Sequence, residues 1–219
     1  MIVPIVCVVG KSGVGKTFVM ERLVTELKGR GYRVATIKHS VNGFDIDQAG
    51  KDSWRYVEAG SDAVVISSAQ KLALITKVDH DYNLAELGRF IGPDFDIILA
   101  EGFKKEKAAK IEVHRKELGP GLLCAKEEVL AIVTDEPLEI DVPQYSLEDA
   151  PGLVALIEKR FLTTEKKDVV ALFVNEEPIP LNPFVRSFIS KTLLGMVSAL
   201  KKVPEATKID ISIRRKGEE

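Results

Sequence analysis

The segment from Gly10 to Thr17 contains residue types whose spacing suits the binding of phosphate groups. Two glycines bracket four residues and are followed by lysine and threonine, which is the pattern of a phosphate-binding loop. Glycines allow successive amide groups to face a phosphate, Lys16 adds a full positive charge, and the Thr17 hydroxyl can ligate Mg²⁺. A glycine-rich turn without a ligand is the alternative. The residues expected to bind are Gly10, Lys11, Ser12, Gly13, Val14, Gly15, Lys16 and Thr17.

A carboxylate is expected near such a metal ion, at the end of a neighbouring strand. Residues 96–100 form an apolar strand candidate, and Glu101 follows it directly. We expect Glu101 to lie beside Mg²⁺, binding it through water and positioning an attacking water molecule. The alternative is an ordinary surface carboxylate. Asp96, at the other end of the same strand, is expected to be structural.

Two further residues are candidates at this site. Asp135 ends another apolar run and could accept hydrogen bonds from guanine N1–H and the exocyclic amine, although a turn aspartate before Pro137 is the alternative. Lys11 could reach a nucleotide across a subunit interface and complete the site from a partner subunit. A solvated loop lysine is the alternative there.

The loop after the second predicted strand carries further polar residues of less certain purpose. His39 is either functional or a hydrogen-bonded structural residue, and the acids at 45 and 47 could approach the metal. Lys51 and Arg55 are candidate contacts for a second anion. Trp54, the single tryptophan, is expected either near that site or packed against the sheet.

The residues around these motifs predict alternating strands and helices. Residues 2–9 are apolar throughout, as in a strand of a parallel sheet that is covered on both faces. From Gly15 the apolar residues recur at helical spacing. The pattern predicts an α/β fold of the P-loop NTPase type, a mainly parallel sheet with helices on both faces. Further strands are predicted at 33–37, 63–67, 72–76, 96–100, 111–114 and 129–134, and helices at 51–59, 84–91 and from Pro151 to Phe161.

The composition changes after Phe161, which predicts a second part of the chain. Residues 1–162 are expected to form the nucleotide-binding domain, 163–168 a polar linker, and 169–219 a small α+β unit. In that unit we expect a strand at 169–174, a turn at 176–178, a helix after Asn182 and a one-sided strand at 209–213. Such a short unit has little core of its own and is expected to pack on the main domain or on a second subunit.

Composition excludes several classes of protein. The chain has 31 Lys and Arg against 33 Asp and Glu, so its formal charge of −2 does not suit a nucleic-acid coat. Two cysteines cannot form a disulfide scaffold, and Cys7 is expected to be a buried small hydrophobe. The apolar start is too short to span a membrane. We therefore expect a cytoplasmic globular protein that binds neither nucleic acid nor membrane.

The motifs, taken in order, resemble one known family over roughly residues 1–162. It is molybdopterin-guanine dinucleotide biosynthesis protein B (MobB), a P-loop GTP-binding accessory protein. Besides the phosphate-binding loop, the resemblance rests on Thr36-Ile37-Lys38-His39, Asp45-Ile46-Asp47, Gly50-Lys51-Asp52-Ser53, Ala59-Gly60-Ser61, Glu101-Gly102-Phe103-Lys104 and Lys110-Ile111.

The resemblance implies a homodimer that binds GTP and Mg²⁺ and hydrolyses GTP slowly. It also implies assistance to the molybdenum cofactor guanylyltransferase, which joins GMP to molybdopterin, and makes molybdopterin itself a candidate ligand. Many relatives have further histidines after the lysine-histidine pair, where this chain has Ser40, Val41 and Asn42. A role for an imidazole cluster is therefore in doubt, and the segment after about residue 165 is absent from short members.

These observations favour a Mg²⁺-dependent GTP-binding adaptor with weak hydrolysis. Lys16 and Mg²⁺ are expected to neutralise the phosphates, Glu101 to order the metal and water, and Lys11 to complete the site from a partner subunit. A small-molecule kinase that uses the same loop is the first alternative. A kinase needs a lid with several arginines, whereas the arginines of the first hundred residues form no cluster. The second alternative is a non-hydrolysing interaction module that is ordered by nucleotide.

Overall fold

The computed structural model describes residues 3–119, 121–162, 170–175, 177–201, 206 and 208–213. By their internal contacts, these residues divide into a larger unit, Val3–Leu162, and a smaller unit that follows Leu162. The linker predicted at 163–168 lies outside the described residues. Across the described ranges, no helix combines the length and the apolar character needed to cross a membrane.

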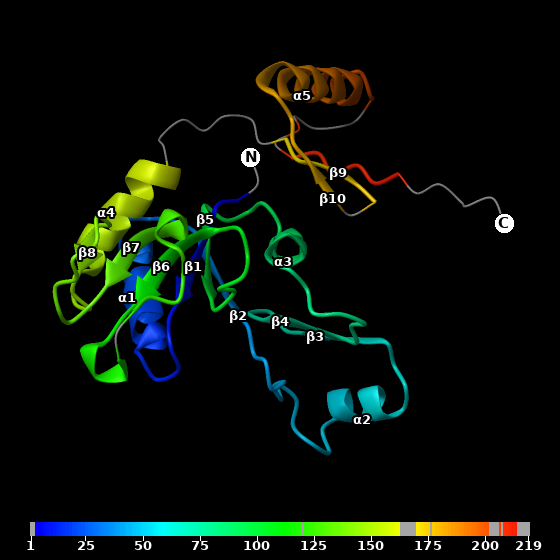
Figure 1. Cartoon of the computed structure of the whole chain (residues 1–219). Helices are drawn as coiled ribbons and strands as arrows, with labels where there is room; N and C mark the ends of the chain where they lie inside the picture. The colour runs from blue at the N-terminus through cyan, green and yellow to red at the C-terminus, as the bar shows by residue number, and fades with distance from the viewer. Residues whose placement is uncertain are drawn as a thin grey trace. The chain divides into compact units, whose positions relative to one another are not determined.

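Six strands of the larger unit form one parallel sheet within the described residues, in the order β2-β5-β1-β6-β7-β8 (Figure 1). The strands are β1 (Ile5–Val9), β2 (Val34–Lys38), β5 (Ile97–Glu101), β6 (Ala109–Val113), β7 (Val129–Val133) and β8 (Gln144–Tyr145). Because the strands run in one direction, their carboxyl ends share one edge of the sheet. The loops after β1, β5, β6 and β7 therefore meet there.

Helices cover both faces of this sheet, as predicted. Alternate residues of β1 point to opposite faces. Val6 and Val8 pack in the core under α1 (Lys16–Gly29) and α4 (Ala150–Phe161). Cys7 and Val9 pack in a second core with Leu84 of α3 (Leu84–Ile91). The continuous apolar composition of β1 and β5 thus follows from burial on both sides.

Local signals set the helix boundaries. Asn83 caps α3 by accepting hydrogen bonds from the amides of Ala85 and Glu86, and the Glu86 carboxylate accepts from the Asn83 amide in return. This reciprocal capping box satisfies donors that the first helical turn leaves free. Asp149 caps α4 through the Gly152 amide. Asp96 accepts a hydrogen bond from the Arg33 amide at the far end of the sheet, as its predicted structural role requires.

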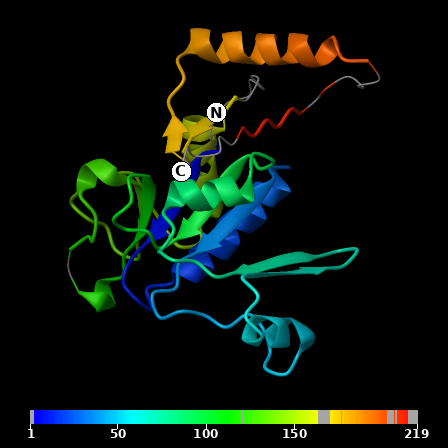
Figure 2. The same ribbon diagram turned by 90° about the vertical axis from the view of Figure 1, so that its right-hand side faces the viewer.

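Residues 52–76 contain a short helix and a hairpin outside the main sheet. Helix α2 (Asp52–Glu58) packs against β3 (Ala63–Ser67), which pairs with β4 (Leu72–Thr76) in a two-stranded antiparallel sheet. Figure 2 shows this hairpin extending away from the six-stranded sheet. Both of its strands have the predicted bounds.

The smaller unit contains a hairpin and a helix. Strands β9 (Leu172–Val174) and β10 (Glu177–Ile179) pair antiparallel, and α5 (Pro183–Ser198) begins after Asn182, whose side chain accepts from the Val185 amide. Two predictions were wrong. Residues 177–178, expected in a turn, belong to β10, and residues 209–213, expected to be a strand, have no regular structure. Alternation alone predicted that last strand, but a strand also needs a partner for its backbone hydrogen bonds.

Candidate nucleotide-binding site

The loop between β1 and α1 has the backbone that its sequence predicts. Gly10, Gly13 and Gly15 have φ angles of 150°, 75° and 98°, values that residues with a side chain rarely adopt. Gly15 precedes the helix and offers no side-chain cap, and the first turn of α1 contains no acidic residue. The first amides of α1 are therefore free of a side-chain cap, as in an anion-binding helix start.

Lys16 lies across this loop. Its ammonium donates hydrogen bonds to the carbonyl oxygens of Gly10, at 3.1 Å, and of Lys11, at 2.8 Å. The positive charge is therefore held against the main chain of the loop by two carbonyl acceptors.

Glu101 and Thr17 are in contact, although 84 positions separate them in sequence. The Thr17 hydroxyl donates to Glu101 Oε2 at 3.2 Å, because β5 lies beside β1 and ends at the same edge. The Lys38 ammonium lies 3.6 Å from Glu101 Oε1. The Glu101 side chain is 15% exposed.

The donor set at this point fits Mg²⁺. A hydroxyl and a carboxylate are hard oxygen ligands, and Mg²⁺ is commonly held by one or two protein oxygens together with phosphate and water. The described residues contain no group of three or more His, Cys, Asp or Glu side chains that could form an all-protein metal cage. Thr17 and Glu101 would therefore supply only part of the coordination, as in a metal site completed by phosphates.

His39 follows the end of β2, and its backbone lies beside that of Glu101. The His39 amide donates to the Glu101 carbonyl, its ring nitrogen Nε2 lies 2.9 Å from Asp81, and its ring packs 5.0 Å from the Phe103 ring. Asp47 accepts a hydrogen bond from Ser53 at the start of α2. That bond engages Oδ1, whereas Oδ2 is buried without a hydrogen-bond partner among the described residues, and the metal contact of Asp47 stays a prediction.

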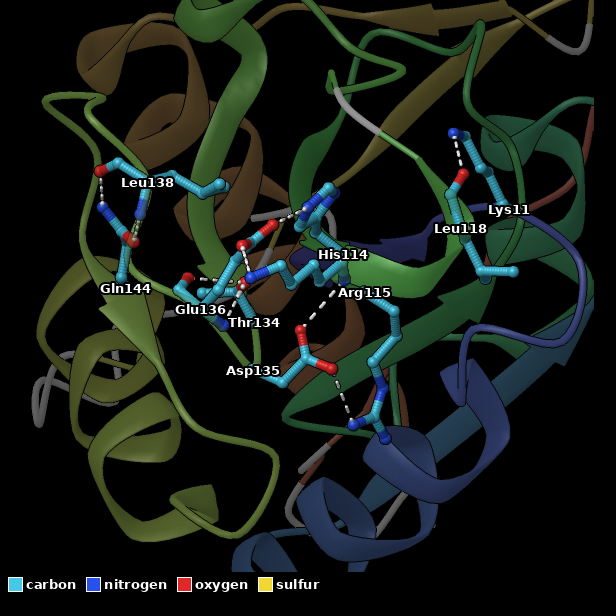
Figure 3. Close-up of polar contacts among 10 residues, drawn as sticks. Lys11, His114, Arg115, Leu118, Thr134, Asp135, Glu136, Leu138 and Gln144 are labelled. Carbon is cyan, nitrogen blue, oxygen red and sulfur yellow. Dashed lines mark hydrogen bonds and ion pairs between the residues drawn. The ribbon is translucent and has the colours of Figure 1, made fainter.

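Asp135, which follows β7, is linked to the phosphate-binding loop by Arg115, a residue that the sequence motifs did not indicate. Arg115, which follows β6, donates through Nε to the Val14 carbonyl at 3.4 Å. Its Nη1 approaches Asp135 Oδ2 at the same distance (Figure 3). The amide of Lys116 donates to Asp135 Oδ1 at 3.0 Å. Only its position in the sequence could have indicated Arg115, because it follows a predicted strand, as Glu101 and Asp135 do.

These contacts hold Asp135 in its charged form. The hydrogen bond from the Lys116 amide, and then the Arg115 guanidinium, lower the pKa of the Asp135 carboxyl below its ordinary value. An ionised carboxylate accepts hydrogen bonds and donates none. Asp135 is therefore prepared to face a ligand that presents N–H donors.

A depression of about 300 Å³ lies beside Asp135. Thr134 and Gln144 brace its walls, since Thr134 exchanges hydrogen bonds with Glu136 and Gln144 exchanges them with Leu138 (Figure 3). The depression is shallow and open to solvent. It is lined by Thr134, Asp135, Glu136, Pro137, Gln144, Tyr145 and Ser146.

Lys11 is directed to the same region within its own chain. Its ammonium donates to the Leu118 carbonyl at 2.6 Å, at the end of the short 3₁₀ turn η1 (Lys116–Leu118). The contact joins the second position of the phosphate-binding loop to the segment that follows β6. Of the predicted residues, Glu101 contacts Thr17 directly, whereas Asp135 is linked to the loop through the side chain of Arg115.

The parallel sheet and this loop define the class of P-loop NTPase-like α/β proteins. Within that class, the sequence profile of the family "Molybdopterin guanine dinucleotide synthesis protein B", MobB, matches residues 5–135. The chain belongs to the MobB family.

Individual relatives agree with this assignment. The molybdopterin-guanine dinucleotide biosynthesis adapter protein of Haemophilus influenzae is 39% identical over 160 residues, which cover 71% of this chain and 88% of the relative. A crystal structure of Bacillus subtilis MobB is 29% identical, with a TM-score of 0.59 over 74% of this chain and 99% of that one.

One relative also extends over the second unit. The putative molybdopterin-guanine dinucleotide biosynthesis adapter protein of Methanocaldococcus jannaschii is 21% identical over 243 aligned positions, covering 96% of this chain and 98% of the relative. The residues after Leu162 therefore have a counterpart in at least one protein of this kind.

Proposed function

We propose that this protein is a Mg²⁺-dependent, GTP-binding adapter with weak GTPase activity, which assists the attachment of GMP to molybdopterin. Membership of the MobB family and the names of the curated relatives support the adapter role in molybdopterin-guanine dinucleotide biosynthesis. The guanylyltransferase would be its protein partner, and molybdopterin is a candidate ligand. The cytoplasmic location stays a prediction.

The observation that carries the nucleotide proposal is the contact between Thr17 and Glu101 beside the phosphate-binding loop. It joins two predicted metal-side groups, Thr17 in the first turn of α1 and Glu101 at the end of β5. When bound there, Mg²⁺ would neutralise phosphate charge. Lys16 would hold the outer phosphates, and Glu101 would orient the metal's water and the attacking water. Catalysis would then rest on positioning and on charge stabilisation of the transferred phosphoryl group.

The guanine preference would come from Asp135. Asp135 is one of the residues that line the depression, and its carboxylate is anchored by the Lys116 amide. Guanine presents N1–H and a 2-amino group, whereas adenine presents a bare ring nitrogen at position 1. An ionised carboxylate therefore favours guanine over adenine at this point.

The protein would act as a homodimer, with Lys11 reaching the partner's nucleotide. In the structure the Lys11 ammonium is bound to Leu118 O, so this role would require the ammonium to leave an acceptor in its own chain. The apolar surface of the β3–β4 hairpin is the proposed contact between the two copies, because Val65, Leu72 and Leu74 are 59%, 73% and 51% exposed.

Calorimetric titration of wild type and of Lys16→Ala with GTP, ATP and Mg²⁺ tests the proposal. Wild type should bind GTP more tightly than ATP, and EDTA should weaken the binding. Lys16→Ala should lower GTP affinity by about 10- to 100-fold, the scale of a charge-assisted hydrogen bond. Lys28→Ala, an exposed lysine in the last turn of the same helix, is the matched control.

Two results would reject the assignment: GTP affinity in Lys16→Ala equal to that of wild type, or a wild-type preference for ATP. Thermal unfolding of both variants checks that the fold is retained. A phosphate-release assay separates the weak GTPase from a module that binds GTP without hydrolysing it. Adding candidate acceptors to that assay separates both from a kinase.

A further inference from the structure

Arg115 lies between the phosphate-binding loop and the proposed base site, and contacts both. Its Nε reaches the Val14 carbonyl of the loop at 3.4 Å. Its Nη1 reaches the Asp135 carboxylate, also at 3.4 Å (Figure 3). The loop passes close over the guanidinium, since a Cβ placed on Gly15 would lie 3.7 Å from Nη2. One side chain therefore spans the gap between the ends of β1 and β7.

The order of the strands produces this bridge. Strand β6 lies between β1 and β7, and Arg115 is the second residue after its end. The preceding residue, His114, is 5% exposed and faces Glu136, so the backbone from which Arg115 projects is fixed in the sheet edge. The Arg115 side chain itself is 31% exposed, which leaves part of it open to a ligand at this edge.

The chemistry of arginine suits this position better than that of lysine. A guanidinium presents several N–H donors in a rigid plane, so it can serve a carbonyl and a carboxylate at once, whereas an ammonium acts as a point charge. Both 3.4 Å separations are long for hydrogen bonds, so charge attraction supplies most of the contact with Asp135. The Lys116 amide fixes the other carboxylate oxygen.

We propose that Arg115 is a positioning residue that holds Asp135 in register with the phosphate-binding loop, so that purine recognition is coupled to phosphate binding. The ligand class is a purine nucleoside triphosphate that presents N–H donors at positions 1 and 2 of the base. This inference rests on the proposed GTP site. In this arrangement Arg115 supports the discrimination between bases, whereas Lys16 and the loop bind the phosphates.

The test compares GTP, ATP and inorganic tripolyphosphate by calorimetry, each with Mg²⁺, in wild type, Arg115→Met and Arg115→Lys. Arg115→Met should lower GTP affinity by about tenfold, the scale of one charge-assisted contact, and leave ATP and tripolyphosphate within about twofold. Arg115→Lys should recover part of the GTP preference. Arg33→Met is the matched control, because Arg33 lies at the opposite end of the sheet beside Phe95.

A double-mutant cycle with Asp135→Asn tests the coupling itself. Asp135→Asn should abolish the preference for GTP over ATP. Adding Arg115→Met should not lower the ratio of GTP to ATP affinity further, because both substitutions disrupt the same contact with the base. Unfolding temperatures, together with retained tripolyphosphate binding, show that the loop is intact in each variant.

Either of two results would overturn the inference. Equal losses for GTP, ATP and tripolyphosphate in Arg115→Met would make Arg115 a general phosphate or structural residue. An unchanged ratio of GTP to ATP affinity would remove it from base recognition. If Lys16→Ala leaves GTP affinity intact, or wild type fails to prefer GTP, the proposed function fails and this inference with it. If Asp135→Asn abolishes the preference but Arg115→Met keeps it, only the inference fails.

Discussion

The Cys7 thiol lies on β1, three residues before the phosphate-binding loop begins. Its side chain is fully buried, and burial raises its pKa to about 12, because the charged thiolate would lose its hydration. The expectation of a buried small hydrophobe is confirmed. Such a thiol should be chemically inert in the folded protein, in spite of its place next to the candidate site.

We predict that iodoacetamide at pH 8.5 will not modify Cys7 in the native protein and will modify it in urea, as followed by mass spectrometry. A Cys124→Ser variant makes Cys7 the only thiol. Rapid native modification of Cys7 in that variant would contradict its burial.

The same raised pKa predicts how stability changes at alkaline pH. Because the folded pKa of Cys7 exceeds the unfolded value of about 8.5, the stability it contributes is complete below pH 8.5 and is lost as the pH rises toward 12. The difference in unfolding free energy between wild type and Cys7→Ala should therefore shrink over that range in urea titrations. A constant difference would show that Cys7 titrates normally in the folded state.

At the scale of elements, the site depends on the junction between β1 and α1. Gly10 has a φ angle of 150°, and a Cβ there would lie 2.5 Å from the Val113 carbonyl oxygen and 2.9 Å from a Val14 methyl group. The carbonyl belongs to the last residue of β6 and cannot move without disturbing the sheet. Only glycine therefore allows the loop to leave β1 at this point.

Gly10→Ala should lower the free energy of unfolding by about 1–3 kcal/mol and weaken GTP binding, because the chain must shift away from β6. Urea denaturation and calorimetry measure the two effects. Gly29→Ala at the end of α1 is the matched control, since a Cβ there meets nothing within 4 Å, and it should be neutral or stabilising by up to about 1 kcal/mol. Equal effects from the two substitutions would show that the Gly10 contact is unimportant.

At the scale of the whole molecule, the β3–β4 hairpin of the larger unit presents an exposed apolar face. Within the hairpin, Val65 pairs with Leu74, and Leu72 lies two residues away on the same face. These exposed apolar side chains form a continuous strip on a two-stranded sheet, and an isolated hairpin of this kind is marginally stable in water. A second copy of the chain is the occupant that we propose for it.

Leu74→Asp should therefore shift the protein from dimer to monomer in sedimentation equilibrium, since a charge would be buried at the contact. Ala73→Asp, on the opposite face of the same strand, is the control and should leave the dimer intact. A wild-type monomer, or a dimer that survives Leu74→Asp unchanged, would exclude the hairpin as the interface.

The elements read correctly from the sequence were those whose signals are local. The hairpin strands and α3 have the predicted bounds, because Asn83 caps the helix and because the apolar runs are bounded by turn residues. The prediction of a strand at 209–213 was wrong, because an alternation of apolar and polar residues does not specify a partner strand. Local patterns show what a segment can form, and tertiary contacts decide whether it does.

The same division applies to the site. The phosphate-binding loop follows from its own eight residues, because glycine conformations, the lysine and the helix start are all determined within the segment. Glu101 was a sound expectation, since carboxyl ends of parallel strands share an edge. Its 3.2 Å contact with Thr17, however, requires β5 to lie next to β1, and no local signal specifies that order.

Arg115 was found only in the tertiary structure. The sequence by itself determined the fold class, the loop and the carboxylates at the strand ends, because each follows from short-range pattern and elementary stereochemistry. The strand order alone placed β6 between β1 and β7, and so set one guanidinium between Val14 and Asp135. Which side chains meet across a sheet edge depends on long-range packing of the strands, and a linear pattern does not contain that information.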